Sequence, residues 1–534
     1  MRRMDLRHIL AGHIPVSGRE AVSPVDVLML LVVNLSIAQD PLYELEQWVE
    51  SLDLRAVGYR HPPLVRFTDD RFARALDKLY ESDRASLLTR IVVRAVKAFD
   101  VQLNQIHSDS TTVKAFGRIP GRTRTGLELH HGHSTDHRPD LKQLVFNLSI
   151  SRDGAVPVYH KVYPGNRNDE TTHIETWETL CRLHGAADFL YVADCKLCTQ
   201  KQLAHIVGRG GRAITSMPEN WTEARRFKMA LRAAPQPKKV IWRRPLPSDE
   251  SAAEYVSLFD DICRTDHGGY PLYWFTSSEK RHRDRRGRHE RLQRAEAALG
   301  ELSPKVNTRR LKKKSRIQRV AAAILRKYHV EPFFDLRIIT HREHVRSRYR
   351  GRPGTFPRYR IRYRDTYSLH WSRDLMALRR ETRTDGVFPL LCTDPAIPPK
   401  NVLQAYKYQP RLEKRFEQFK SIHRAAPLLF KKIQRVEANM FVFFMALLVQ
   451  ALLERCIRQQ LDQRRSPPLK LYPEDREALH PTTSQILKTF DGLSTYAITE
   501  NGRQVEEYRD AINDTHREVL ALLDISETDY WKVT

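Results

Sequence analysis

The order of the predicted strands and helices between residues 101 and 216 constrains the fold of this chain more than any other feature of its sequence. Apolar residues there switch between the two-residue period of a strand and the three- to four-residue period of a helix. The turn Arg152-Asp153-Gly154 between two alternating runs predicts an antiparallel hairpin. The predicted strands span 101–108, 144–151, 156–162, 189–193 and 212–216, and the predicted helices span about 171–184 and 199–208. This β-β-β-α-β-α-β order predicts an α/β fold with a mixed sheet and helices packed on it.

Helical periodicity dominates on both sides of this sheet region. Residues 25–50 and 68–99 predict an N-terminal helical domain, and residues 409–424 and 436–461 return to the same apolar spacing. The most apolar run, at 440–453, has 14 residues. A bilayer needs roughly 20 residues, so we interpret this run as a core helix and expect no membrane partner.

The positive charge of the chain is concentrated in two segments. The sequence holds 90 Lys+Arg against 64 Asp+Glu, a formal net charge of +26, which predicts a polyanionic partner and most simply a nucleic acid. Residues 279–329 contain 18 Lys+Arg and five acidic residues, and residues 342–364 contain nine arginines and one glutamate. The first segment is amphipathic, and a solvated helical hairpin is the alternative interpretation for it.

The second basic segment interleaves arginines with tyrosines around 351–357, which predicts the tip of a hairpin. Arginines neutralise phosphates while aromatic rings stack on bases, so this composition favours a nucleic-acid surface. The residues that we expect to contact DNA in the two segments are Lys312, Lys313, Lys314, Arg348, Arg350, Arg358 and Arg360.

Three carboxylates occupy positions that favour metal-dependent chemistry. Asp109 follows the first predicted strand in HSDSTTVK, Asp194 follows the fourth in YVADCKLC, and Glu413 lies on a later helix in YKYQPRLEKRFEQFK. Carboxylates that converge at strand ends can hold two divalent cations about 4 Å apart for phosphodiester chemistry. Taken singly, an aspartate after a strand is more often a turn or cap residue, so only the combination with the strand order favours a site.

These segments resemble the bacterial insertion-sequence DDE transposases, in the branch with a Tyr-x2-Arg-x3-Glu-x6-Lys signature. HSDSTTV and VADCKL are similar to the two aspartate segments, and Tyr406, Glu413 and Lys420 have the spacing of the signature. Residues 132–143 and 163–172 are similar to connecting segments, and the resemblance runs from about residue 23 to 462. The signature arginine is replaced by Gln409, which can bond a phosphate but adds no charge.

The resemblance implies a domain layout as well as a fold. It implies an RNase H-like mixed-sheet catalytic core, and a compact core does not leave the 218 residues between Asp194 and Glu413 without structure. We therefore expect a large inserted domain. The expected parts are an N-terminal helical DNA-binding domain at 1–98, core segments at 99–219 and 401–462, a basic insertion at 220–400 and a C-terminal helical region at 463–534 with a helix over 503–523.

The resemblance further implies the activity, cofactors and partners of the chain. It implies a DNA transposase in which Asp109, Asp194 and Glu413 hold two Mg²⁺ ions, with Mn²⁺ as a substitute, while Tyr406, Lys420 and the residue at 409 face DNA phosphates. The expected partners are double-stranded DNA, at the terminal inverted repeats of a mobile element and at its target, and a second copy of the chain on DNA.

Six cysteines are too sparse for a disulfide framework and predict a reducing cytoplasm. The resemblance implies that this is the bacterial cytoplasm or nucleoid. Two alternatives to a transposase stay open: a non-catalytic DNA-binding protein derived from one, and a metal-dependent DNA nuclease without strand transfer.

Overall fold

The structure is a computed structural model in which the chain forms two compact units. It describes residues 1–534 except 19, 39, 56, 60–65, 118, 133–137, 139, 168–171, 247–248, 261–262, 349–358, 423–429, 473, 475, 479, 501–502 and 532–534. Unit 1 contains residues 1–215 and 401–534, and unit 2 contains residues 216–400. Unit 2 thus covers the segment that we expected to be inserted, at 220–400.

The sheet of unit 1 contains the five strands that the sequence predicts. They are β1 (Gln105–Lys114), β2 (Gln143–Ser151), β3 (Pro157–Pro164), β4 (Leu190–Ala193) and β5 (Arg212–Ser216), in the order β3-β2-β1-β4-β5. The first three strands are antiparallel neighbours, whereas β4 runs parallel to β1 and β5 parallel to β4. The predicted helices that connect the last strands are α6 (His173–His184) and α7 (Gln200–Val207). This mixed sheet with connecting helices is the α/β arrangement expected from the element order.

Strand β1 begins four residues after the start of its predicted range of 101–108 and ends six residues beyond it. It continues to Lys114 because its second half pairs with β2, through contacts that end at Lys114 and Gln143. Its pairing with β4 stops at Ser108. Asp109 therefore lies inside β1, at the point where the neighbouring β4 ends, rather than at the end of its own strand.

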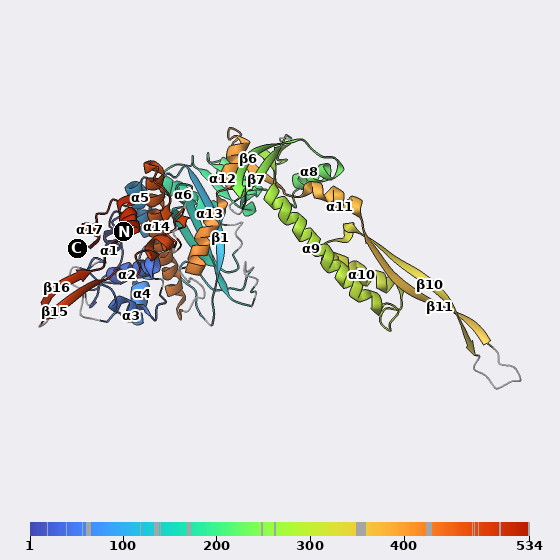
Figure 1. The fold of residues 1–534 in the computed structure, drawn as a ribbon, viewed down its shortest axis with the longest axis horizontal. Helices are drawn as coiled ribbons and strands as arrows, with labels where there is room; N and C mark the ends of the chain where they lie inside the picture. The colour runs from blue at the N-terminus through green and yellow to red at the C-terminus, as the bar shows by residue number, and fades with distance from the viewer. Residues whose placement is uncertain are drawn as a thin grey trace. The chain divides into compact units, whose positions relative to one another are not determined.

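Helix α14 (Ile433–Arg464) forms the centre of the helical part of unit 1 (Figure 1). It packs against α2 (Pro24–Ile37) and α4 (Asp69–Glu81), which follow α1 (Leu6–Ala11) and precede α5 (Arg84–Phe99) in the chain. By length and composition α14 could cross a membrane, but 89% of its most apolar 18-residue window is buried inside the protein. This burial agrees with the prediction of a core helix.

The C-terminal region corrects a prediction. Residues 503–523 were expected to form one helix, but Arg503–Arg509 is strand β16, paired with β15 (Thr495–Glu500), and the helix α16 spans only Asp514–Leu522. A short pair, β13 (Leu469–Lys470) and β14 (Glu477–Ala478), and helices α15 (Thr483–Lys488) and α17 (Glu527–Trp531) complete the region. Tyr496, Ile498 and the dipeptide Asn501-Gly502 are strand and hairpin signals in the sequence that favour a hairpin over a helix.

Unit 2 contains a second set of strands and a helical hairpin. Its sheet has the order β12-β9-β7-β6, with β8 beside β9. The strands are β6 (Lys238–Leu246), β7 (Asp249–Phe259), β8 (Cys263–Arg264), β9 (Pro271–Ser277) and β12 (Val387–Cys392). Helices α8 (Thr222–Ala233) and α11 (Leu375–Glu381) belong to the same unit.

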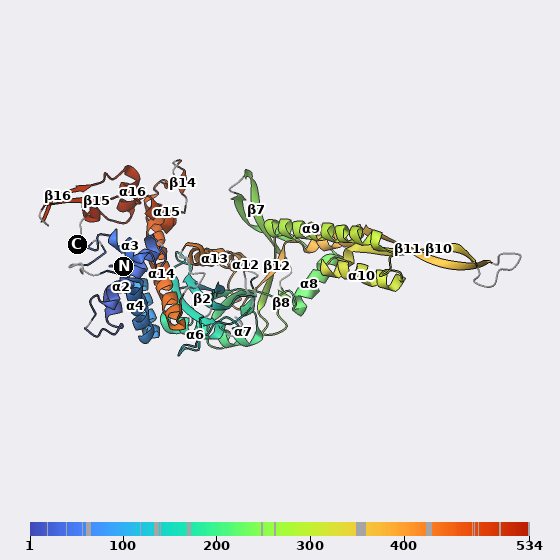
Figure 2. The same ribbon diagram turned by 90° about the horizontal axis from the view of Figure 1, so that it is seen from below.

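The two basic segments of the sequence form one module within unit 2, which we call the basic module. It consists of α9 (Ser278–Leu302), α10 (Lys314–Lys327) and the antiparallel ribbon of β10 (Phe334–Arg348) and β11 (Tyr359–Arg373). Figures 1 and 2 show the two helices alongside the base of the ribbon. Leu299, Ile317 and Leu325 are buried with Leu369 in a core that the four elements share. The helical hairpin and the ribbon therefore pack together by their apolar faces, and their charged faces are left outward.

Candidate active site and DNA-binding surface

Asp109 and Asp194 lie side by side on neighbouring parallel strands. Ser108 of β1 pairs with Ala193 of β4, so each aspartate is the next residue after a paired one. Asp109 is half-buried, and its Oδ1 accepts a hydrogen bond from the Ser110 backbone N at 2.7 Å. The Asp194 side chain is 31% exposed, and its Oδ1 accepts a bond from the Lys196 backbone N at 3.1 Å. Both carboxylates thus keep part of their surface open to solvent.

The charges of the two aspartates act on the same neighbours. Burial raises the pKa of the Tyr191 hydroxyl, and the charges of Asp194 and Asp109 raise it further. Burial also raises the pKa of the Cys195 thiol, and the same two charges act in the same direction. Two like charges that converge in this way repel one another, and a cation between them would relieve the repulsion.

His173 is a site residue that the sequence reasoning missed. It is the first residue of α6 and is buried, its Nδ1 lies 3.0 Å from the Tyr191 hydroxyl, and its Nε2 lies 4.0 Å from Asp194 Oδ1. The imidazole therefore borders Asp194 from the side opposite solvent. Its sequence signal is slight: it lies one residue beyond the connecting segment at 163–172.

Helix α13 (Gln409–Glu417), which carries Glu413, lies along the face of the sheet where Asp109 is found. Gln409 Oε1 lies 3.0 Å from His107 Nδ1 of β1. Further along the chain, the ring of Phe419 stacks on Phe146 at 4.4 Å, and Phe146 pairs with Thr111 of β1. The chain from Gln409 to Phe419 therefore runs in the direction of β1, and exposed Glu413 lies between these two contacts, at the level of Asp109.

The three carboxylates do not form one metal-ligand cluster. Within the described ranges, no group of three or more His, Cys, Asp and Glu side chains could hold a metal ion. The structure brings Asp109 and Asp194 together and leaves Glu413 on the helix beside them. Mg²⁺ needs only one or two protein carboxylates because it retains waters and takes up substrate phosphate oxygens. The aspartate pair has the oxygen donors and the open surface that such an ion requires.

The remaining residues of the signature are near α13 but differ in exposure. Tyr406 ends α12 (Pro399–Tyr406) and is half-buried, as is Lys420. Gln409 is only 7% exposed and bonds to buried His107, which corrects the expectation that it faces DNA. Residues Gln418–Ile422 form a π turn.

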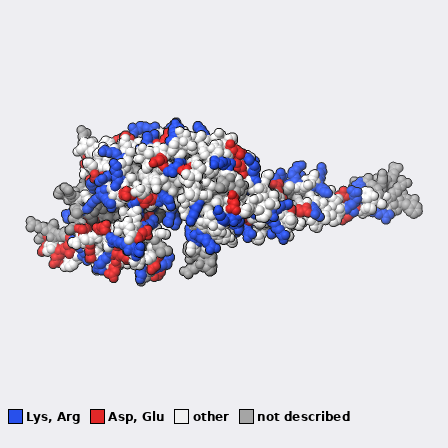
Figure 3. Space-filling model, turned by 90° about the horizontal axis from the view of Figure 1, so that it is seen from above, with Lys and Arg blue, Asp and Glu red and all other residues white. Residues whose placement is uncertain are grey.

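Five of the seven expected DNA-contacting residues of the basic module lie within the described residues. Lys312, Lys313 and Lys314 are exposed at the start of α10, and Figure 3 shows lysine and arginine side chains along the module. Arg348 and Arg360 lie in β10 and β11 near the end of the ribbon. Arg350 and Arg358, with the predicted tip at 351–357, lie outside the described residues.

The ribbon also exposes apolar side chains between its arginines. Tyr359, Ile361 and Tyr363 are 49%, 63% and 65% exposed. The guanidinium of Arg346 lies 4.6 Å from the ring centroid of Tyr359, and that of Arg342 lies 5.8 Å from the centroid of Tyr363. Cationic groups beside exposed rings are the side-chain types that contact phosphates and bases.

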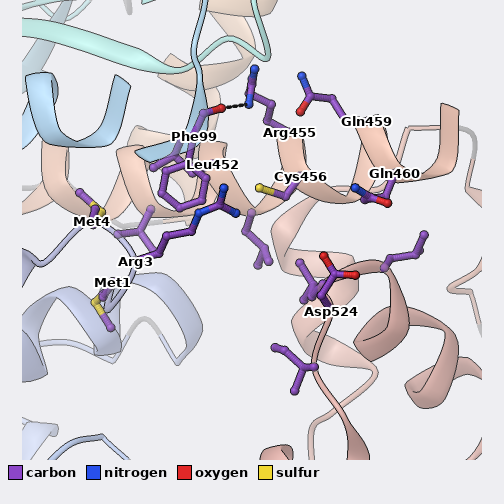
Figure 4. A pocket seen from close by; sticks show the side chains of 15 residues that line it. Met1, Arg3, Met4, Phe99, Leu452, Arg455, Cys456, Gln459, Gln460 and Asp524 are labelled. Atoms are coloured by element: carbon purple, nitrogen blue, oxygen red, sulfur yellow. Dashed lines mark hydrogen bonds between the residues drawn. The ribbon is translucent and has the colours of Figure 1, made fainter. Parts of the chain in front are cut away.

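A separate cavity of about 430 Å³ lies in unit 1, away from the carboxylates. Its lining includes Met1, Arg3, Phe99, Cys456 and Asp524 (Figure 4). The Arg3 guanidinium covers the Phe99 ring at 4.5 Å. None of Asp109, Asp194 and Glu413 lines this cavity, so it is not the site in which these carboxylates act.

Comparisons with known proteins match an N-terminal part of the chain to a family and the chain to a solved structure of low similarity. Residues 1–93 match a family described as a domain of unknown function, DUF4277, which is found in transposases. No curated protein matches the chain. A solved structure titled as a piggyBac transposase synaptic complex with hairpin DNA matches with 9% identity and a TM-score of 0.30, over 51% of this chain and 63% of that chain. A TM-score this low does not indicate a shared fold or activity. The chain spans less than two thirds of that structure's length.

Proposed function

We propose that this protein is a DNA transposase that binds the ends of a mobile element and cleaves and transfers DNA strands. The proposal is supported by the placement of Asp109 and Asp194 directly after the last paired residues of the parallel strands β1 and β4, beside the helix that bears Glu413. The match of residues 1–93 to a family found in transposases supports the same function independently of these residues.

The fold proposed for the catalytic part is RNase H-like. What supports it is the strand order β3-β2-β1-β4-β5, in which three antiparallel strands are followed by two parallel ones. In this fold the interruption between β5 and α13 is the place of unit 2. The DDE branch with the Tyr-Arg-Glu-Lys signature is part of the proposal, and it rests on the spacing of Tyr406, Glu413 and Lys420.

The proposed cofactor is Mg²⁺, with Mn²⁺ as a substitute, held as two ions by Asp109, Asp194 and Glu413. Bound Mg²⁺ would supply Lewis-acid chemistry at a phosphodiester. Asp109 and Asp194 would provide oxygen ligands for the metal from a rigid sheet, and His173 borders Asp194. Tyr406 and Lys420 contact phosphates beside the cleaved bond and so hold the substrate in place. Glu413 completes the ligand set when DNA and metal are present.

The proposed partner is double-stranded DNA, at the terminal inverted repeats and at the target, in the bacterial cytoplasm or nucleoid. The N-terminal helices and the basic module bind the duplex, and Lys312, Lys313 and Lys314 contact its phosphates. Pairing of two element ends requires two active sites, so the working assembly is a dimer of this chain on DNA.

The test of this function compares two aspartates of the same sheet region. Asp109→Ala is expected to abolish Mg²⁺-dependent cleavage of DNA that carries the element's ends and to leave the dissociation constant for that DNA unchanged. Asp188→Ala is the matched control, because Asp188 is 80% exposed and lies before β4, at the other end of the strand. Normal cleavage by Asp109→Ala would refute the assignment.

A non-catalytic DNA-binding protein is the second candidate. The observation that favours it is that the described residues contain no three-member cluster able to hold a metal ion. Specific binding of the element's ends without strand cleavage in Mg²⁺ or Mn²⁺ would identify this function. Product analysis separates a nuclease from a transposase, because a nuclease leaves cut ends free and a transposase joins them to target DNA.

A further inference from the structure

Helix α13 is anchored by a buried polar contact four residues before Glu413. His107 Nδ1 and Gln409 Oε1 are 3.0 Å apart, and His107 Nε2 lies 2.8 Å from the Gln105 side-chain amide. In the tautomer that satisfies both contacts, Nδ1–H donates to Gln409 and Nε2 accepts from Gln105. All three side chains are less than 9% exposed. The first turn of α13 is therefore hydrogen-bonded directly to β1, two residues from Asp109.

A second buried contact anchors the helix two residues after Glu413. The Arg415 side chain is 6% exposed and lies 2.9 Å from the carboxylate of Glu454, which is 5% exposed, on α14. Its Nε donates to the backbone oxygen of Ala155 at 3.1 Å, and another nitrogen donates to that of Gly154 at 3.3 Å. Arg415 thus ties α13 at once to a neighbouring helix and to the turn between β2 and β3.

The second anchor continues into α2. Arg415 donates to Gln418 Oε1 at 2.8 Å, Gln418 Nε2 donates to Gln450 Oε1 at 2.6 Å, and Gln450 Nε2 donates to the Ser36 backbone oxygen at 2.9 Å. Gln418 is also the first residue of the π turn that follows α13. The end of the helix is therefore held through a continuous row of buried hydrogen bonds.

Polar anchors of this kind are a costly way to hold a helix. An apolar cluster of the same volume would be as stabilising or more so, because buried charges lose hydration. Hydrogen bonds, in contrast, require particular atoms to meet, so they fix the rotation and the height of a helix in a way that apolar packing does not. These hydrogen bonds thereby fix the position of Glu413, which lies between the two anchors and is itself exposed.

We infer that Gln409 and Arg415 are positioning residues that hold Glu413 at the level of Asp109 and Asp194. The inference rests on the proposed function for the role of Glu413, but the anchoring itself concerns the free protein. Neither residue touches DNA or metal in this scheme. They act by fixing the position of the α13 backbone. If the helix shifted by one residue, Glu413 would rotate around the helix axis and point away from the aspartates.

The first measurement is hydrogen exchange of the α13 amides in the free protein. Arg415→Lys keeps a positive charge against Glu454 but loses the planar set of donors that reaches Gly154 and Ala155. We expect faster exchange in residues 411–417 and unchanged exchange in β1 and β2. Unchanged exchange in α13 would overturn the inference, whether or not the protein cleaves DNA.

The second measurement is the Mg²⁺ concentration that gives half-maximal cleavage. Supporting residues of a metal site typically change metal affinity or activity about 10- to 100-fold, so Arg415→Lys should raise this concentration about tenfold or more, with DNA affinity unchanged. Arg288→Lys is the matched control, because Arg288 is a buried arginine that bonds Asp385 in unit 2. A lower yield of active enzyme with an unchanged Mg²⁺ requirement would show a merely structural role and overturn the inference.

Gln450→Met provides a second variant in case Arg415→Lys does not fold. It removes the acceptor of Gln418 and leaves the ion pair of Arg415 intact, and it should move both measurements in the same direction by a smaller factor. No change in either measurement would refute the role of this row of bonds. A wild-type protein that cleaves no DNA would refute the proposed function alone, because hydrogen exchange would still decide whether the helix is anchored.

Discussion

Ser108 of β1 pairs with Ala193 of β4 in a parallel register, and this pairing sets Asp109 beside Asp194. Because the two strands run parallel, the residues that follow Ser108 and Ala193 lie on the same side of this pair. These residues are Asp109 and Asp194, which are therefore neighbours. Burial and the two carboxylate charges together raise the pKa of Tyr191 and of Cys195. Both carboxylates therefore act on the same two neighbouring side chains.

Mg²⁺ should stabilise the folded protein through this aspartate pair. At a Mg²⁺ concentration ten times its dissociation constant, one bound ion adds about 1.4 kcal/mol to the free energy of unfolding. Asp109→Asn should abolish this gain, since the amide removes a charge but keeps an oxygen to accept from the Ser110 N–H. Thermal unfolding with and without MgCl₂ measures the effect, and an equal gain in both proteins would contradict it.

The lysines at the start of α10 should contribute to DNA affinity in a salt-dependent way. Replacement of Lys312, Lys313 and Lys314 by glutamine should weaken binding at low salt and lower the slope of log K against log salt by up to about one for each lysine. Lys470→Gln, at an exposed lysine of the C-terminal region, is the control. Equal salt slopes for the triple variant and wild type would exclude these lysines from the interface.

The ion pair of Arg288 and Asp385 should be needed for the stability of unit 2. Two guanidinium nitrogens lie 2.6 and 2.7 Å from the two carboxylate oxygens, and the side chains are 9% and 3% exposed. Arg288→Met leaves a buried carboxylate and should cost about 3–5 kcal/mol in urea unfolding. A second substitution, Asp385→Leu, should restore most of that loss, because an apolar pair is as stable as a buried ion pair. Failure of the double variant to recover would show that the site needs the charges themselves.

Stability should fall in acid because of His160. Its ring lies 4.7 Å from Phe444 and 5.6 Å from Phe146, and burial lowers its pKa from 6.5 to about 3. The unfolded chain binds a proton below about pH 6.5 while the folded chain does not. The contribution of the neutral His160 ring to stability is therefore fully present above pH 6.5. The free energy of unfolding decreases by up to about 1.4 kcal/mol per pH unit as the pH falls from 6.5 towards 3.

The variant His160→Phe should reduce this acid sensitivity in urea unfolding at pH 7, 6 and 5. His267→Gln, at an exposed histidine, should leave the pH dependence as in wild type. An identical pH dependence in His160→Phe and wild type would assign the acid sensitivity to other groups.

Short-range patterns in the sequence predicted the strands of the unit 1 sheet and the helices that connect them, and their errors have local causes. The alternating and helical periods located β1 to β5 and α6, because a side chain's repeat along the chain reflects which face is buried. Strand β1 was predicted too short because Ser110, Thr111 and Thr112 are polar, and only pairing with β2 extends it. Strand β16 was taken for part of a helix, although Asn501-Gly502 is a hairpin signal.

The candidate site was likewise predictable only in part from the sequence. The two aspartates could be predicted as neighbours because both follow apolar strand patterns whose order is encoded locally, although Asp109 lies inside β1 and only Asp194 follows its strand. The burial of Gln409 against His107 could not, since the two residues are 302 positions apart. The contact of Arg415 with Gly154 spans 261 positions, and the place of His173 beside Asp194 likewise depends on how α6 packs.

The amino-acid pattern alone thus predicted an α/β chain, two aspartates that follow strand patterns and two strongly basic segments, because periodicity and charge are properties of short segments. Which side of α13 faces the sheet, how Glu413 is held and which signature residue is buried depended on tertiary packing. Hydrogen bonds between residues hundreds of positions apart form only when distant elements meet, and no local pattern encodes their geometry.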